Sequence, residues 1–408
     1  MRRYILVSGT LIALAVSAPS FAQKTGGGDD SATITQVDGG GNLATQHQPG
    51  GEGNTVAITQ TDAENSTATQ EQWRNLNGVD FAIGGRQTIN QTGTAGSTAS
   101  QVDNAFNSVQ TATQDGTGVL GATPTSVTQT INSPFGSGNT QTSTQTASNG
   151  SSVNQTLGTA TPGTFGFNNN SQTATQSGQT GSSITQLIDG ASSNNAQTAT
   201  ESEPSGGSNS VSQTILASNA DTQTASIGGF SNGNTITQLQ QSGSHNDTQT
   251  AGIGLFSGNT ITQLQQSGSF NDTQTAVISL GGGNTITQLQ QSGSHNDTQT
   301  ASVNDSSVNT IDQLQATGSF NNTQTVMVDE GSVHDLQYQG PGVNGGSETI
   351  NQALGLGNQA GQAQGNNNNV AAINQTGGGG NVAIQNQGLL PGQTGFMSLS
   401  GGTIVRHP

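Results

Sequence analysis

Several kinds of residue are missing or scarce in this 408-residue chain, and each shortage excludes a class of structure. Cysteine is absent, so disulfides and thiolate metal sites cannot form. Apolar residues make up only 28% of the chain and aromatic residues 3%, too few for a conventional globular core at this length. Charged residues are also few, at 7%, whereas disordered proteins usually carry many charges.

Positive charge is the scarcest kind of charge. Six Lys and Arg stand against 23 Asp and Glu, for a net charge of −17. Two of the six, Arg2 and Arg3, lie in residues 1–22, which contain no acid. Removal of that segment would change the net charge from −17 to −19. The remaining cations, Lys24, Arg74, Arg86 and Arg406, are not clustered, which excludes nucleic-acid binding through phosphate neutralisation.

The first 22 residues have the pattern of a secretory signal peptide. Arg2 and Arg3 precede an apolar run from Ile5 to Val16, and Ser20-Phe21-Ala22 supplies a small-residue cleavage site. The apolar run is too short for a transmembrane helix, which needs ~20 residues. We therefore expect a secreted chain with no membrane span once residues 1–22 are removed. Arg2-Arg3 also permits a twin-arginine signal, but general secretion is the favoured route.

The residues that are abundant, mainly Thr, Gln, Asn, Ser and 60 Gly, are organised in repeats. An 18-residue stretch that begins NTITQLQQSGSHNDTQ returns with small changes at Asn234, Asn259, Asn284 and Asn309, a period of 25 residues. A fixed period of this size is typical of repeat proteins, in which each unit needs its neighbours to form a core.

Within one repeat the side-chain period is two, which predicts strands. Asn234, Ile236, Gln238 and Gln240 fall on one side of a first strand, with Thr235, Thr237 and Leu239 on the other. After a turn, Asp247, Gln249, Ala251 and Ile253 share a side of a second strand, with Thr248 and Thr250 opposite. We expect the sides with Gln and Ile or Val to point inward.

Stacking such repeats at ~4.7 to 4.8 Å places identical residues above one another, so each Gln amide can donate to one neighbour and accept from the other. The expected ladder residues are Gln238, Gln263, Gln288, Gln313, Ile236, Ile261, Ile286, Ile311, Gln249, Gln274, Gln299 and Gln324. The expected turn residues are Gly243, Gly268, Gly293, Gly318, Asn246, Asn271, Asn296 and Asn321.

Looser versions of the same strands recur along most of the chain. We therefore predict an all-β fold, a β-solenoid or cross-β stack of strand-turn-strand repeats with about thirteen rungs. After the signal peptide, residues 23–30 form a flexible lead, and residues 31–388 form the repeat array, with its regular copies at 234–328. Residues 389–408 leave the pattern and are expected to be a C-terminal tail or cap.

No arrangement of residues indicates catalysis, a metal or a cofactor. His245 and His295 alternate with Phe270 and Phe320 in one repeat slot, so that slot favours packing over chemistry. Asp247, Asp272 and Asp297 share a slot with Asn322, which indicates a turn position where the side chain bonds the local backbone. No Ser-His-Asp arrangement of a hydrolase and no phosphate-binding loop is present. We expect a protein that is not an enzyme.

The turns of the regular copies resemble those of curlin repeats, the subunits of curli functional amyloid. Gln241-Ser-Gly243-Ser-His-Asn246 has the Gln-x-Gly-x-x-Asn pattern of that family, and the next two copies repeat it. Residues 375–387, QTGGGGNVAIQNQ, are similar with one extra turn residue. The resemblance covers roughly residues 31–388. The 25-residue period, and Thr248 where the family has Ala, depart from the family's pattern.

The resemblance implies a secreted bacterial subunit that polymerises into cross-β fibres outside the cell, for biofilm matrix and surface adhesion. It further implies a nucleating partner subunit and an outer-membrane secretion pore. Two other functions stay open. The outward Thr-x-Thr pairs suit an ice-binding solenoid, and a capped solenoid could serve as a non-polymerising adhesin. If Asp247, Asp272 and Asp297 repel along a stack, polymerisation should be faster at low pH.

Overall fold

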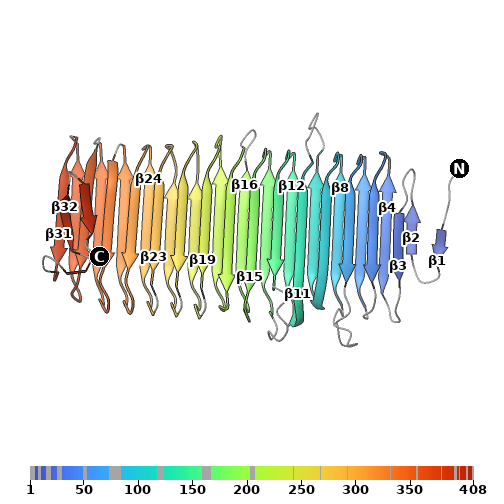
Figure 1. Cartoon of the computed structure of the whole chain (residues 1–408), viewed down its shortest axis with the longest axis horizontal. Coiled ribbons are helices and arrows are strands. Elements are labelled where there is room, and N and C mark those ends of the chain that lie inside the picture. The colour runs from blue at the N-terminus through green and yellow to red at the C-terminus, as the bar shows by residue number, and fades with distance from the viewer. Residues whose placement is uncertain are drawn as a thin grey trace. The chain divides into compact units, whose positions relative to one another are not determined.

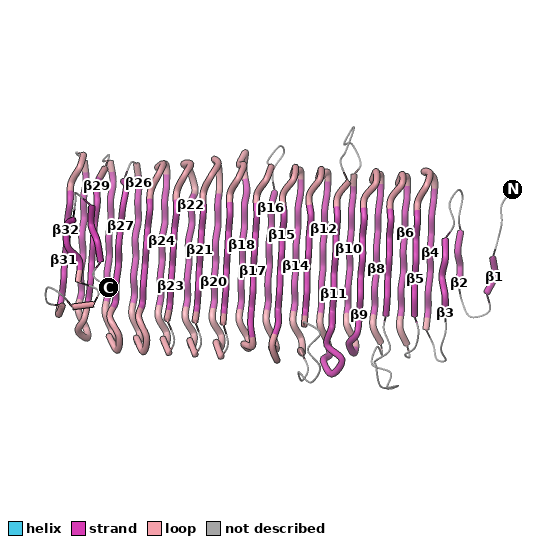
Figure 2. The backbone as a smooth tube through the Cα atoms, in the orientation of Figure 1, coloured by secondary structure: helices cyan, strands magenta, loops and turns pink. Residues whose placement is uncertain are grey.

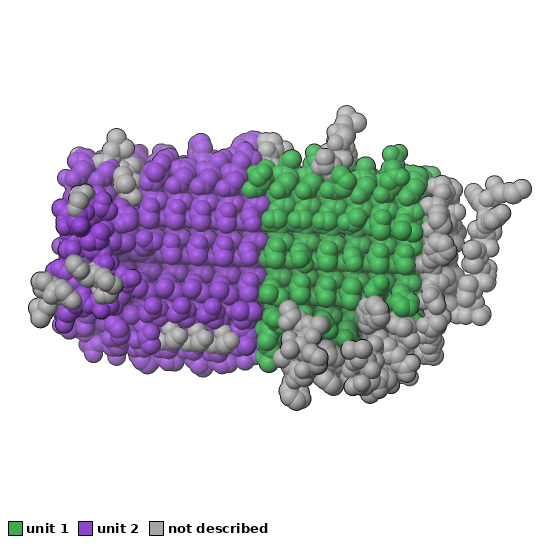
Figure 3. All heavy atoms as spheres, in the orientation of Figure 1, with its two compact units in different colours: residues 1–208 green, residues 209–408 purple. Residues whose placement is uncertain are grey.

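The structure, a computed structural model, describes the chain apart from a set of short segments. These are residues 1–4, 8–10, 15–19, 25–29, 49–52, 73–83, 117–123, 159–166, 203–206, 242, 267, 292, 331, 355–356, 378, 390–392, 395, 401–402 and 407–408. The described residues form strands and turns and no helix, so the predicted all-β class is confirmed (Figure 1). They divide into two units, Met1–Ser208 and Asn209–Pro408 (Figure 3).

Each unit is a parallel β-solenoid, as the repeats predicted. The chain alternates between two sheets, so one turn consists of an even-numbered strand and the odd-numbered strand after it (Figure 2). Strand n pairs with strand n + 2 in parallel and without register shift in nearly every turn. In the regular block, Ile236 lies opposite Ile261 and Gln238 opposite Gln263, as the 25-residue period requires.

In unit 1 the even-numbered sheet contains β2 (Leu11–Leu14), β4 (Ser31–Val37), β6 (Thr55–Thr61), β8 (Arg86–Thr92), β10 (Val109–Asp115), β12 (Thr140–Thr146), β14 (Ser171–Ser177) and β16 (Ala196–Ser202). The odd-numbered sheet contains β3 (Ser20–Lys24), β5 (Leu43–Gln48), β7 (Thr67–Gln72), β9 (Thr98–Phe106), β11 (Ser126–Ser137), β13 (Ser152–Leu157) and β15 (Ser183–Asp189). Strand β1 (Ile5–Val7) pairs antiparallel with β2.

In unit 2 the even-numbered strands are β18 (Thr222–Gly228), β20 (Thr248–Ile253), β22 (Thr273–Ile278), β24 (Thr298–Asn304), β26 (Thr323–Asp329), β28 (Ser347–Ala353) and β30 (Val370–Thr376). The odd-numbered strands are β17 (Ser210–Leu216), β19 (Thr235–Gln240), β21 (Thr260–Gln265), β23 (Thr285–Gln290), β25 (Thr310–Gln315), β27 (Ser332–Gln339), β29 (Asn358–Gln364) and β31 (Val382–Gln387).

The core of each unit lies between its two sheets and is built from alternate residues of every strand. Ile236, Gln238 and Gln240 of β19 are fully buried, while Thr235, Thr237 and Leu239 are partly exposed. The same alternation holds for β20, where Gln249, Ala251 and Ile253 are buried. Small and β-branched apolar residues share this core with glutamines. This mixture explains how a chain with 28% apolar residues folds at all.

The two strand patterns of the sequence do not correspond to the two sheets. The Ile-x-Gln pattern of Ile89-Gln91 lies in the even-numbered sheet, where Ile89 pairs with Ala112. In the regular block the same pattern lies in the odd-numbered sheet, and at Ile350 it returns to the even-numbered one, opposite Val326. Because both patterns place Gln two residues after a small or branched apolar residue, either one fits the same column.

The C-terminal segment, predicted to be a tail or cap, contains a hairpin of β32 (Met397–Ser400) and β33 (Thr403–Arg406). Its Met397 and Ile404 pack on outward-facing Tyr338 and Ala363, so the hairpin covers the outer face of the odd-numbered sheet. Hydrogen bonds between Met397 and the side chain of Asn386 fix it there. The hairpin therefore covers a side of the stack and leaves its last strands unpaired: among the described residues no strand pairs with the outer edges of β30 and β31.

The predicted signal peptide and flexible lead lie partly outside the described residues. Within them the backbone forms β1 to β3, and β2 and β3 pair with β4 and β5. Cleavage after Ala22 stays a prediction. In the part of the chain that the structure describes, no helix is long and apolar enough to cross a membrane.

The alternation of faces predicts unequal effects for two adjacent substitutions in β21. Ile261→Asp buries a carboxylate without a partner, and we expect it to destabilise the fold by several kcal/mol. Thr262→Asp should change stability by about 0.5 kcal/mol or less, because Asp312 already occupies that outward column in β25. Urea unfolding of the two variants measures the difference. Equal losses would contradict the assignment of faces.

Candidate functional site

The inward glutamines form continuous hydrogen-bonded ladders along the stacking direction. Gln238 Nε2 donates to Gln263 Oε1 at 2.8 Å, and Gln263 and Gln288 donate onward to Gln288 and Gln313 at the same distance. The predicted ladder Gln249, Gln274, Gln299 and Gln324 has the same geometry in the facing sheet, at 2.9 Å. Ile236, Ile261, Ile286 and Ile311 stack in the column beside the first ladder.

The second N–H of each ladder amide joins the two sheets. Gln263 Nε2 also donates to the backbone carbonyl of Thr250 at 3.0 Å, and Gln274 Nε2 donates to that of Leu264 at 3.2 Å. One buried amide thus donates two hydrogen bonds and accepts one. Leaving a buried donor or acceptor unpaired costs ~1 to 3 kcal/mol, so a Gln in this column is most stable where both neighbouring turns supply Gln or Glu.

The predicted turn residues lie where the chain passes between the sheets. Gly243, Gly268, Gly293 and Gly318 have φ of 84°, 81°, 79° and 76°. Asn246, Asn271, Asn296 and Asn321 have φ of 57°, 55°, 55° and 54°. Gly and Asn are the residues that adopt this left-handed region most easily. The turns stack as regularly as the strands, since Asn271 Nδ2 donates to Asn296 Oδ1 at 3.2 Å.

The Asp slot beside this turn forms a second ladder. Asp272 bonds the local backbone of Phe270, as expected for a turn, but this slot also bonds the next turn. Asp272 Oδ1 accepts the backbone N–H of Asp297 in the next turn at 2.8 Å, and its Oδ2 accepts the Ser294 hydroxyl. Asp247 and Asp297 bond their next turns in the same way. The alternation of residues in the sequence placed Asp247 on the inward side of its strand, and the side chain is indeed buried. That alternation was therefore a better guide to its position than the usual preference of Asp for turns.

Burial in this slot raises the pKa of the carboxyls. The pKa of Asp247 is raised to about 8, that of Asp272 to about 7 and that of Asp297 to about 6, against an ordinary value of 3.8. Desolvation is the main cause, and hydrogen bonds from Ser and backbone N–H groups oppose it. Much of this ladder is therefore uncharged near neutral pH, so the repulsion expected from stacked carboxylates is smaller than the formal charge suggests.

Other buried acids were missed from the sequence. Glu201 and Glu348 end Gln ladders, where they accept bonds from Gln176 and Gln324 at 2.9 Å. Asp335 occupies the column of Ile311. Burial raises the pKa of Glu348 and Asp335 well above the ordinary values. Aligning residues 347–353 with 323–329 by the period would have placed Glu348 under Gln324.

The alternating His and Phe slot forms a partly exposed column of rings. His245, Phe270, His295 and Phe320 stack with centroid separations of 4.8, 5.5 and 4.7 Å. The packing role predicted for this slot fits that geometry. Among the described residues no group of three or more His, Asp or Glu is placed to hold a metal ion.

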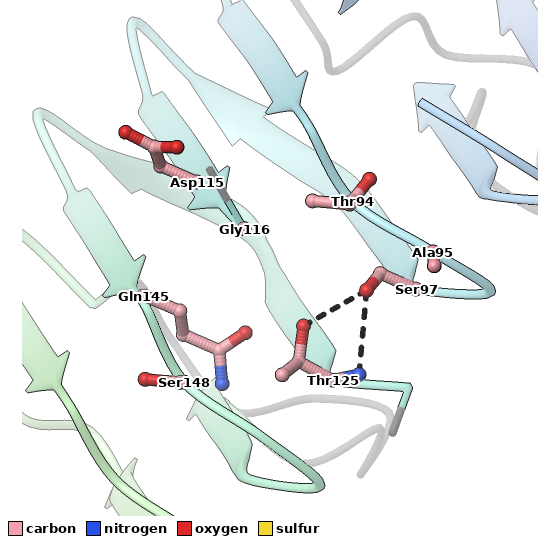
Figure 4. A pocket seen from close by; sticks show the side chains of 8 residues that line it. All are labelled: Thr94, Ala95, Ser97, Asp115, Gly116, Thr125, Gln145 and Ser148. Atoms are coloured by element: carbon pink, nitrogen blue, oxygen red, sulfur yellow. Dashed lines mark hydrogen bonds between the residues drawn. The ribbon is translucent and has the colours of Figure 1, made fainter. Parts of the chain in front are cut away.

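One small pocket lies between turns of unit 1, at the point where β10 ends and β11 begins (Figure 4). Ser97 and Thr125 line it and bond each other through their hydroxyls at 3.1 Å. The cavity has about 10 Å³, room for roughly one water molecule. It is too small for a substrate.

The two end turns of the repeat array are among the places where ladders stop. In its first turn, which follows β2 and β3, Gln36, Gln46 and Gln48 donate to the second turn, but their Oε1 atoms are buried and accept no hydrogen bond. Gln240 starts a ladder inside unit 2, and its buried Oε1 also accepts no hydrogen bond. The residue before it in the column is Ile215, which has no side-chain donor. At the other end, β30 and β31 are the outermost strands of their sheets. At this end the ladders and the strand edges thus have no described neighbour on one side.

The buried acids predict that stability falls as pH rises. Their folded pKa values of about 6 to 8 exceed the ordinary 3.8, so the folded state binds more protons and stability is lost between about pH 4 and pH 8. Asp272→Asn should raise the urea midpoint at pH 8 and weaken this dependence, because Asn322 fills the same slot naturally. Asp312→Asn, on the outward face, is the matched control. If the Asp272→Asn variant showed the same pH dependence of stability as the unchanged protein, Asp272 would not be a source of that dependence.

Comparisons of the chain with protein-family models and with curated protein sequences found no match. The resemblance to curlin repeats therefore depends on the Gln-x-Gly-x-x-Asn turns and their spacing. What the molecule shows independently is a stack with in-register polar ladders, tight glycine turns and two strand edges at its C-terminal end that no described strand pairs with.

Proposed function

We propose that this protein is a secreted bacterial structural subunit that polymerises into extracellular amyloid-like fibres of the curli type, for biofilm matrix and surface adhesion. The observation that carries the proposal is the open C-terminal end of unit 2, where β30 and β31 have no described neighbour on their outer edges. An unpaired parallel edge is a template for another strand, and soluble proteins usually protect such edges with charge, Pro or a covering segment.

The residues at this end favour addition of another turn. β30 and β31 contain the inward glutamines Gln375, Gln385 and Gln387, and no Lys, Arg or Pro. The nearby hairpin of β32 and β33 packs on the outer face instead of the edge. A non-polymerising adhesin would require a segment over these edges, so the position of the hairpin favours polymerisation. The partner is another copy of the chain, and an outer-membrane secretion pore and a nucleator subunit are proposed on the resemblance alone.

Fibre formation by the purified chain tests this function. The chain from Gln23 onward should form dye-binding fibres without a partner, with a meridional X-ray reflection at ~4.7 to 4.8 Å from the stacked turns. Growth should be faster at pH 5 than at pH 8, since protonation of the buried acids favours the folded stack. A chain that stays monomeric at high concentration at both pH values would contradict the proposal.

A second candidate function, ice binding, is favoured by the outward threonines. Thr235 and Thr237 of β19 stack on identical residues of β21 and β23, and Thr248 and Thr250 of β20 form equivalent columns. With ~4.8 Å between strands and ~6.7 Å between alternate residues, each face presents a regular grid of hydroxyl and methyl groups. Asp312 and the Leu239 column interrupt the grid on one face.

Thermal hysteresis of the soluble monomer separates the two functions. An ice-binding face should give a freezing-point gap that Thr250→Lys and Thr275→Lys reduce, since both project from the same outward column. Thr250→Ser and Thr275→Ser provide a control that retains the hydroxyls. A solution without hysteresis that goes on to form fibres leaves the structural subunit as the function.

A further inference from the structure

The first and last turns of the repeat array, which follow and precede no other repeat, match each other in length and in residue type. Residues 31–48 and 370–387 each span 18 positions and align without a gap, with identical residues at ten positions. The shared positions include the inward residues Ala, Ile and Gln of the even-numbered strand, the inward Ala and two Gln of the odd-numbered strand, and a Gly-Gly-Gly-Asn turn. By the same count the first turn shares eight positions with its stacked neighbour, residues 55–72, and the last shares nine with residues 347–364.

The turn backbones also match. Asp38 and Gly41 have φ of 53° and 72°, and the aligned Gly377 and Gly380 have φ of 68° and 72°. At Gly41 the next turn lies so close that a Cβ would fall 2.2 Å from Asn65 Oδ1. At the aligned Gly380 a Cβ would have nothing within 4 Å of it. The last turn thus has the backbone of a stacked turn, and at this position no following turn crowds it.

The hydrogen-bonding groups at the two ends are complementary. Within a ladder each Gln donates to the Gln or Glu of the following turn. Gln36, Gln46 and Gln48 in the first repeat turn lie next to β2 and β3, yet their buried Oε1 atoms accept no hydrogen bond, and each residue is at most 4% exposed. Gln375, Gln385 and Gln387 occupy the same three columns in the last turn. Their amides are the donors that these acceptors lack.

We propose that the last turn of one copy, residues 370–387, stacks on the first turn of the next copy, residues 31–48, in the register that aligns Ile373 with Ile34 and Gln375 with Gln36. This inference rests on the proposed fibre function and specifies its interface. The junction continues the three ladders across the copies, with Gln385 donating to Gln46 and Gln387 to Gln48. In the full chain β2 and β3 pair with β4 and β5. Removal of residues 1–22 frees β4 from β2 and leaves only Gln23 and Lys24 of β3, which the junction displaces from His47 and Gln48.

Cross-linking tests the register and polarity of this junction. Thr35 and Asn374 face outward at aligned positions, and the chain has no native cysteine. Chains from Gln23 onward carrying Thr35→Cys are mixed with chains carrying Asn374→Cys and treated with a short bifunctional thiol reagent. The junction places the two sulfurs on adjacent strands ~5 Å apart, so mixed dimers should form, while neither variant alone should cross-link.

A charge placed at the interface tests its energetic role. Gln375→Lys puts an ammonium among the junction glutamines, and we expect at least a tenfold slower elongation of preformed wild-type seeds. Thr376→Lys is the matched control, because it adds the same charge one residue away on the outward side, and elongation should change about twofold or less.

The outcomes separate the junction from the fibre function. Fibres that form without mixed Thr35–Asn374 cross-links, or that elongate equally with either lysine, overturn the junction and leave the fibre function standing. Mixed cross-links in short oligomers, with no fibres, support the junction and overturn the fibre function. Cross-links within either single variant show a head-to-head or tail-to-tail contact and overturn the proposed polarity. Absence of both fibres and cross-links overturns both.

Discussion

The structure depends on one interaction, the hydrogen bond between the amides of glutamines stacked in successive parallel turns. An amide buried between two sheets is costly unless its donors and acceptor are satisfied, and here two neighbouring turns and the facing sheet satisfy all of them. This satisfaction fails if a turn slips by one residue, since every inward side chain would then face outward. The ladders therefore specify the register that the few apolar side chains could not specify alone.

The fold class, the 25-residue period and the inward and outward faces could be predicted because they follow from local alternation and exact repetition. Ile236 is apolar and buried, while its neighbour Thr235 is polar and partly exposed, so the residue types alone indicate the two faces. The partners of Asp247 could not be predicted in this way. Its carboxylate accepts bonds from Ser269 and from the backbone of Asp272, and both groups belong to the next turn, 22 and 25 residues further along the chain. The division of strand patterns between sheets was missed because Ile-x-Gln and Ala-x-Gln fill one column equally well.

The buried acids give the stack a sensitivity that its Gln ladders lack. A Gln amide is neutral at every pH, whereas Asp247 and Glu348 must lose their hydration and, at high pH, keep a charge in the core. The chain replaces the acid by Asn at position 322, so the carboxyl is not needed for the turn itself. Retaining acids in successive turns therefore makes the stability of the stack depend on the pH around the protein.

The equal spacing of the regular turns also bears on how such a chain changes in length. The turns from Asn234 to Gln315 contribute the same Ile and Gln side chains to the inward columns of the odd-numbered sheet. Loss or gain of one 25-residue segment leaves all ladders closed and both end turns unaltered, and it shifts the contour length by one strand spacing, ~4.8 Å. Recombination between the matching segments of its gene can thus change the length of this protein by whole repeats of 25 residues while the stacked ladders are preserved.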